Sequence, residues 1–232
     1  MDDGSGQPKI VELPLTRVET DSVRVETTLT VGAEGHATGE SKVANTGVFD
    51  LVARQVFAIN PGNAATLADR LLQTSGQTGS GSYFHSAREN LTRPFGYVMN
   101  FHLDNYIQLP GPGAITIPSG LGSFSNIAYA FEMTAPPARD FAIPFVGGHR
   151  EEITKVLLPD STTILALPKP FKLDTPFGHY ESNYVRSDSG LVVRRMLDLQ
   201  FASATLSAED YVGLRTMWIA IARDLKSQVV YQ

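Results

Sequence analysis

The clearest hydrophobic pattern in the chain lies between residues 175 and 226. Residues 175–186 predict a strand, Ser187 to Gly190 predict a turn, and residues 191–201 predict a second strand in which apolar and polar positions alternate. A period of two is typical of a half-buried strand. The face expected to be buried carries Leu191, Val193, Leu197, Leu199 and Phe201.

A helix is predicted directly after this hairpin, over residues 207–226. Ser207, followed by Glu209 and Asp210, resembles the capping box that opens many helices. The apolar residues that follow recur at helical spacing; they are Tyr211, Leu214, Trp218, Ile221, Ala222 and Leu225. We therefore expect this helix to cover a sheet and close a β-rich domain.

The N-terminal half begins with another hairpin. Residues 22–31 alternate strictly, residues 32–35 are a turn signal, and residues 36–45 fit the returning strand. Residues 49–57 and 64–72 then predict two amphipathic helices, the second capped by Asn63. We interpret the glycine-rich stretch 73–82 as a mobile loop, and predict strands at 83–86 and 95–103.

The middle of the chain is rich in proline. Ten of the 14 prolines lie between Pro110 and Pro176, which disfavours long helices and central strands there. Short extended pieces are predicted at 114–117, 150–158 and 163–167, whereas residues 124–133 fit either a strand or a helix.

These elements predict a mainly β (α+β) protein built from antiparallel, β-sandwich-like subdomains. A helical pair lies near 48–74 and a C-terminal helix near 207–226. The predicted organisation is a flexible segment at 1–20, a hairpin and helix-pair subdomain at 21–110, and a β-rich subdomain at 111–232. The boundary between the subdomains falls within 108–145.

Composition narrows the possible functions. The chain has 232 residues, a net charge of −5 and no run of one sign, so no basic face for nucleic acid is expected. No apolar run is long enough to span a membrane, and the acidic start does not resemble a secretory signal. The absence of cysteine excludes disulfides, thiolate metal sites and a cysteine nucleophile within the chain.

The densest group of ionisable residues is His149-Arg150-Glu151-Glu152. It is compatible with part of a metal site or an acid–base pair, and also with the polar start of a strand. A hydrolase using His149 with Glu151 or Glu152 is one alternative. However, no two histidines have ligand spacing and no nucleophile elbow is present, so we expect no catalytic residue, no metal and no cofactor.

Aromatic residues concentrate around the strand predicted at 95–103. Those that could line a carbohydrate or peptide groove are Tyr83, Phe84, Tyr97, Phe101 and Tyr106. The same residue types also pack the cores of β proteins, so a groove and a core are both compatible with the sequence.

Several segments together resemble one family of exported bacterial proteins. They include Leu13-Pro14-Leu15-Thr16 before the hairpin at 22–45, Leu109 to Gly113, Pro144-Phe145 before Arg150, Thr175 to Gly178, and Arg194-Arg195. Members of that family carry an N-terminal β domain of unknown function, a transglutaminase-like core and a C-terminal region. The chain resembles this C-terminal region.

The resemblance implies a non-catalytic accessory or interaction module, because the family's catalytic cysteine, histidine and aspartate belong to the core. It also implies a periplasmic or cell-surface location, and a transglutaminase-like core domain or another protein as the partner. The alternative that the residues leave open is a carbohydrate- or peptide-binding β module that uses the aromatic residues near 83–106.

Overall fold

One mixed sheet of eight strands runs through the molecule, in the order β3-β4-β2-β1-β7-β11-β10-β9. The computed structural model describes residues 15–232, so most of the predicted flexible segment 1–20 lies outside the described residues. The strands of this sheet are β1 (Ser22–Val31), β2 (Ala37–Asn45), β3 (Gly79–His85), β4 (Gly96–Leu103), β7 (Gly148–Leu157), β9 (Phe171–Thr175), β10 (Gly178–Ser187) and β11 (Gly190–Leu199).

The two predicted hairpins are confirmed. β1 pairs with β2 in antiparallel register and β10 pairs with β11 in the same manner. In β1 and β11 the residues alternate between a buried and a solvent-facing side, as the period of two requires. The turn between β1 and β2 needs Gly35, which has a φ of 85° and sits where a Cβ atom would lie 2.0 Å from the Ile107 carbonyl oxygen.

A parallel pair joins the two halves of the chain. Residues 22–30 of β1 pair with residues 149–157 of β7, whereas all other neighbours in the sheet are antiparallel. The sheet therefore continues from the predicted subdomain 21–110 into the predicted subdomain 111–232. The β-rich α+β class is confirmed, and the predicted sandwich-like halves share this one sheet.

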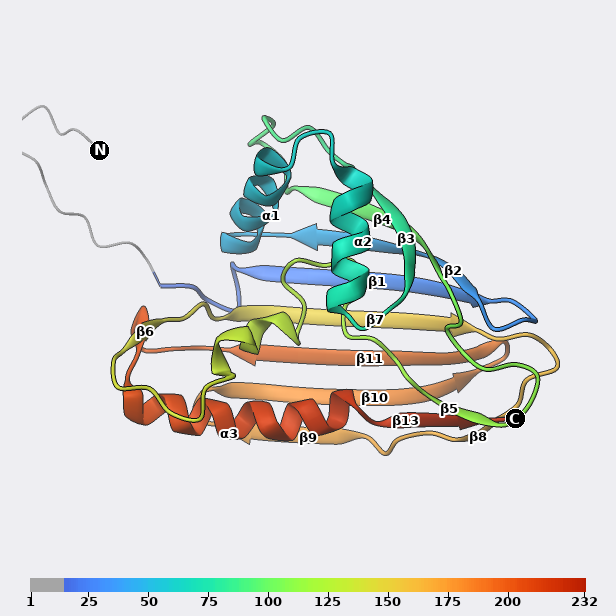
Figure 1. The fold of residues 1–232 in the computed structure, drawn as a ribbon. Coiled ribbons are helices and arrows are strands. Elements are labelled where there is room, and N and C mark those ends of the chain that lie inside the picture. The colour runs from blue at the N-terminus through green and yellow to red at the C-terminus, as the bar shows by residue number, and fades with distance from the viewer. Residues whose placement is uncertain (1–14) are drawn as a thin grey trace, which may run out of the picture.

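Every helix of the described part lies on the same side of the large sheet (Figure 1). The predicted helix pair is α1 (Val48–Ile59) and α2 (Ala64–Thr74), and the C-terminal helix is α3 (Ala208–Leu225). Ser207 caps α3, because its side chain accepts a hydrogen bond from the Asp210 backbone amide. Asn63 precedes α2 but makes no side-chain capping bond.

The proline-rich middle covers the centre of the sheet between the α1/α2 pair and α3 (Figure 1). It contains β5 (Gly113–Thr116), the 3-10 helix η1 (Tyr129–Thr134) and β6 (Ile143–Pro144), so residues 124–133 are a loop and a short helix. Two small sheets close the edges of this layer. One has the order β5-β13-β8, with β13 at Gln228–Tyr231 and β8 at Ile164–Ala166, and the other pairs β6 with β12 (Thr205–Leu206).

Two sequence predictions had wrong boundaries. The stretch 73–82 is not a loop throughout, because β3 begins at Gly79 and pairs with β4 along the edge of the sheet. The strand predicted at 175–186 is β10, which begins only at Gly178, because β9 ends at Thr175 and a tight turn joins the two strands. In both places the pairing of strands decides the structure and overrides the local sequence signal.

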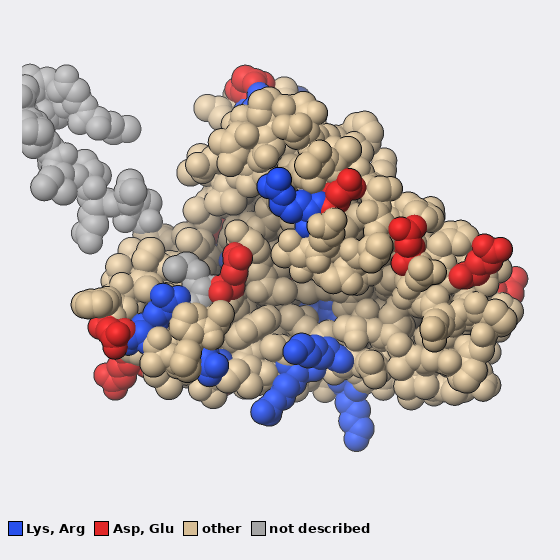
Figure 2. All heavy atoms as spheres, viewed as in Figure 1, with Lys and Arg blue, Asp and Glu red and all other residues tan. Residues whose placement is uncertain are grey.

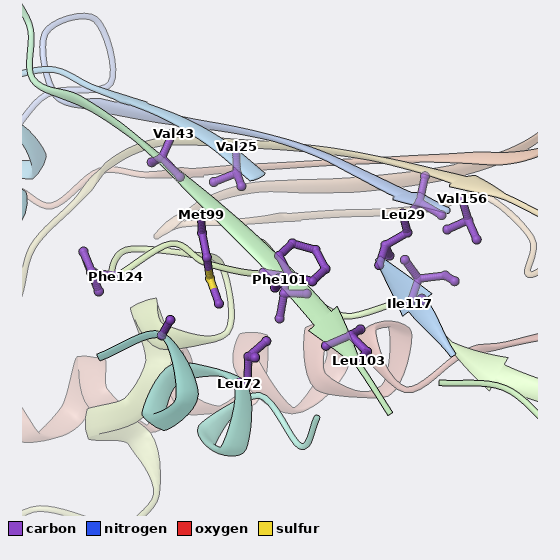
Figure 3. Packing of buried hydrophobic residues seen from close by; sticks show 14 of the residues in the cluster. Val25, Leu29, Val43, Leu72, Met99, Phe101, Leu103, Ile117, Phe124 and Val156 are labelled. Atoms are coloured by element: carbon purple, nitrogen blue, oxygen red, sulfur yellow. The ribbon is translucent and has the colours of Figure 1, made fainter. Parts of the chain in front are cut away.

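Two apolar clusters fill the space between the sheet and its cover. The larger cluster packs α1 and α2 on β1, β2 and β4, and Figure 3 shows Leu72 of α2 close to Phe101 and Leu103 of β4. The second cluster packs α3 on β10 and β11, with Tyr180, Leu197 and Leu214 fully buried. The core therefore lies between the helices and one face of the large sheet.

Replacing Ser207 by alanine removes the capping bond of α3. We expect the free energy of unfolding to fall by about 1 kcal/mol, measured by urea denaturation. Ser80→Ala on exposed strand β3 is the matched control and should change it by less than about 0.5 kcal/mol. Equal effects of the two substitutions would contradict the capping role.

Candidate functional site

The pleat of β7 separates the ionisable group at 149–152. His149 and Glu151 point to the uncovered face of the sheet, whereas Arg150 and Glu152 point into the helix-covered core. The four residues are therefore neighbours in sequence but belong to two different environments, and they do not form one acid–base cluster.

Glu152 binds the segment that covers the sheet. Its Oε1 accepts a hydrogen bond from the Ile127 backbone amide at 2.7 Å, and its two carboxylate oxygens lie 3.0 and 2.9 Å from the donating Ser119 hydroxyl. Gly120 lets the chain pass this close, because a Cβ atom there would lie 2.6 Å from Glu152 Oε1. Burial raises the pKa of the Glu152 carboxyl, and Arg195 and these hydrogen bonds offset part of that effect.

Arg195 binds the same segment from the next strand. It is the register partner of Glu152, is 1% exposed, and donates to the carbonyl oxygens of Pro118 at 3.2 Å and Ile117 at 3.0 Å. It also donates to the Tyr184 hydroxyl at 3.0 Å. Glu152 and Arg195 thus satisfy backbone groups of a cover that has little regular structure of its own.

The partner of His149 is Asp198, at 2.6 Å between Nδ1 and Oδ1 on the uncovered face. Ser22 stands in register beside His149 on β1, but its hydroxyl is hydrogen-bonded to Thr46 at 2.9 Å. Among residues 15–232 no hydrogen bond joins a hydroxyl nucleophile to His149. The sequence did not indicate Asp198 as the partner of His149, because only the β7–β11 register brings them together.

The five candidate aromatic residues do not share one surface. Tyr83, Tyr97 and Phe101 are buried in the core, and Tyr106 is half-buried with its hydroxyl enclosed. Tyr83 donates to the Gly122 carbonyl at 2.9 Å, so its polar end also binds the cover. Phe84 alone of the five is exposed, at 61%, because it occupies the opposite side of the pleat from Tyr83.

A hollow of about 510 Å³ lies beside Phe84 on the uncovered face of the sheet. Ala44 and Val98 contribute apolar surface, while Arg24 and Lys42 contribute charge. Arg24 is bound by both Glu26 and Glu151, and Lys42 lies 3.0 Å from Glu40. The charges around the hollow are therefore largely balanced by neighbours on the same face.

The opposite face, which carries the helices, is shown in Figure 2. Charged side chains of both signs are scattered over it, and most of the visible surface is formed by other residues. Within residues 15–232, no group of three or more histidine, cysteine, aspartate or glutamate side chains could hold a metal ion. No helix in the same range is long and apolar enough to cross a membrane.

Comparison with known proteins finds one family model that matches part of the chain. Residues 124–231 match the family described as a domain of unknown function with solved structure, DUF3858. This region holds four buried charged residues, Arg150, Glu152, Arg195 and Asp224, whereas Phe84 and the hollow lie outside it. The match does not link the chain to a transglutaminase-like family. No curated protein and no solved structure matches the chain significantly.

Adjacent residues on opposite faces of β7 provide a test of the role of the buried Glu152 carboxylate. Glu152→Ala removes the negative charge that offsets Arg195 in the core and leaves the Ile127 amide and Ser119 hydroxyl without their acceptor, so we expect a loss of about 3–5 kcal/mol in the free energy of unfolding. Glu151→Ala removes a surface ion pair and should cost about 1 kcal/mol or less. Urea denaturation of both variants checks this, and equal losses would contradict the assignment.

Proposed function

We propose that the chain is a non-catalytic interaction module that docks another protein domain on the uncovered face of its large sheet. The observation that carries this proposal is the hollow of about 510 Å³ beside exposed Phe84. An uncovered polar face is ordinary for an antiparallel sheet. An exposed aromatic ring beside an apolar hollow with charged neighbours is instead typical of the centre of a protein interface.

The charge pattern around the hollow supports a protein as the partner. Arg24 is bound by Glu26 and Glu151, and Lys42 by Glu40, so little positive charge remains for a polyanion. Nucleic acids and anionic membranes are bound by concentrated basic surfaces. Balanced charges at the rim contribute chiefly to the specificity and rate of association between proteins.

The His149–Asp198 pair fits a role in cross-strand pairing. Oppositely charged or hydrogen-bonded side chains that face each other on neighbouring strands stabilise a sheet. A second such pair, His179 with Asp174, occurs on β10 and β9 at 2.6 Å. The repetition of the same pairing further along the sheet favours a structural role over catalysis.

The resemblance to exported transglutaminase-like proteins suggests what covers the sheet. We propose a transglutaminase-like core, encoded beside this segment in the same gene, as the partner. That assignment would place the module in the periplasm or at the cell surface.

Sequencing the flanking gene and measuring binding test this proposal together. The neighbouring domain, produced separately, should bind the chain in isothermal titration calorimetry. Phe84→Ala should weaken binding by at least about tenfold, because aromatic anchors dominate interface energies. Val212→Ser on the exposed side of α3 is the control and should leave the affinity unchanged.

The proposal fails if no transglutaminase-like segment adjoins this one in the gene. It also fails if the neighbouring domain does not bind, or if Phe84→Ala binds as tightly as the unaltered chain.

A further inference from the structure

A small cavity lies on the helix-covered side of the sheet and is separate from the hollow beside Phe84. Its volume is about 250 Å³, and its walls come from α1, the segment around η1, β6 and β7. The lining residues include Phe49, Val52, Ser125, Pro144, Phe145 and Val146. The cavity is smaller than those that hold drug-sized molecules, and most of its wall is apolar.

Arg150 lines this cavity from β7 and is only 4% exposed. Its guanidinium carbon lies 4.7 Å from the centre of the Phe49 ring. Two of its nitrogens, Nε and Nη1, are buried and have no hydrogen-bond partner. The cavity thus has a mostly apolar wall and is lined by a buried cation, two of whose nitrogens bind no group in the described chain.

The nearest acidic residue on the same side of β7 does not satisfy these donors. Glu152 points into the covered core as Arg150 does, but its carboxylate is occupied by Ser119 and the Ile127 amide. No ion pair of Arg150 exists among residues 15–232. A buried charge without a partner is costly, and such an unsatisfied group calls for an explanation such as a ligand.

Burial lowers the pKa of Arg150 to about 10, while Glu152 raises it in part. A guanidinium with this pKa is still protonated at neutral pH. Arg150 therefore brings a positive charge to the cavity wall under ordinary conditions, and a guanidinium makes charge-assisted hydrogen bonds to a carboxylate.

We propose that this cavity binds a small monocarboxylate with an apolar body, with the carboxylate on Arg150 and the body against Phe49 and Phe145. The Ser125 hydroxyl is a further polar group on the wall. Glu132, hydrogen-bonded to Tyr129, is exposed and also lines the cavity. Its negative charge disfavours dianions such as phosphate esters, and so selects a singly charged acid.

The probe for this site is 3-phenylpropionate, titrated into the full chain by isothermal titration calorimetry. We expect a Kd of about 1 mM or tighter, and no detectable binding of the neutral analogue 3-phenylpropionamide. Arg150→Met should weaken binding by at least about tenfold, because charge-assisted hydrogen bonds to the carboxylate are lost. Arg194→Met, on the uncovered face of β11, is the control and should bind as the unaltered chain does.

The melting temperature of Arg150→Met shows whether a loss of binding comes from the site itself or from unfolding of the variant. Methionine fills a similar volume without the buried charge, so Arg150→Met should not lower the melting temperature. A peptide ending in phenylalanine with a free carboxylate, compared with the free acid, tells whether a peptide terminus or a metabolite is the better ligand. The proposal is overturned if the acid does not bind, if the amide binds equally, or if folded Arg150→Met retains the affinity.

Discussion

The cover of the large sheet depends on two buried charged side chains, Glu152 and Arg195. The segment that crosses the centre of the sheet is rich in proline and has only short regular elements, so few of its backbone groups are satisfied within it. Water cannot reach those groups once the segment is packed down, and each unsatisfied group would cost free energy. Glu152 binds the Ile127 amide, and Arg195 binds two carbonyl oxygens ahead of it. Two charged side chains in the core thus allow a segment with little regular structure to pack as a layer on the sheet.

The single-sided cover gives the two faces of the sheet different physical properties. On the covered face, apolar residues from α1, α2 and α3 meet buried charges that have defined polar partners, with Arg150 as the exception. On the other face, charged side chains pair across strands and remain hydrated. The parallel β1–β7 pair holds both halves in one sheet, so the matched domain at 124–231 contributes only part of each face. Strand β1, which pairs with β7, lies outside the matched residues 124–231, and so do Phe49 and Phe84.

The periodic segments were predictable because each obeys one simple rule. Alternation identified β1 and β11, and helical spacing identified α1, α2 and α3. The same alternation also predicts that Arg195 is buried, although the sequence analysis did not use it. Arg195 lies two residues from both Val193 and Leu197 and therefore faces the core with them. The four ionisable residues at 149–152 suggested one cluster because they are adjacent in sequence. They do not form one, because adjacent residues on a strand point to opposite sides of the sheet. The prediction of a loop over 73–82 was wrong from Gly79 onward. Glycine and serine can form an edge strand when a neighbouring strand, here β4, supplies the hydrogen bonds.

By itself, the sequence determined which residues share a face of each strand or helix, the β-rich class, and the absence of a concentrated run of basic residues or of cysteine chemistry. Only the tertiary structure decided which strands are neighbours, and therefore that Arg195 meets Glu152. It also decided which side of the sheet is covered, and so buried Tyr83 while leaving Phe84 exposed. The physical reason is that periodicity is a local property of the backbone, whereas register and layer order depend on contacts between residues far apart in the chain.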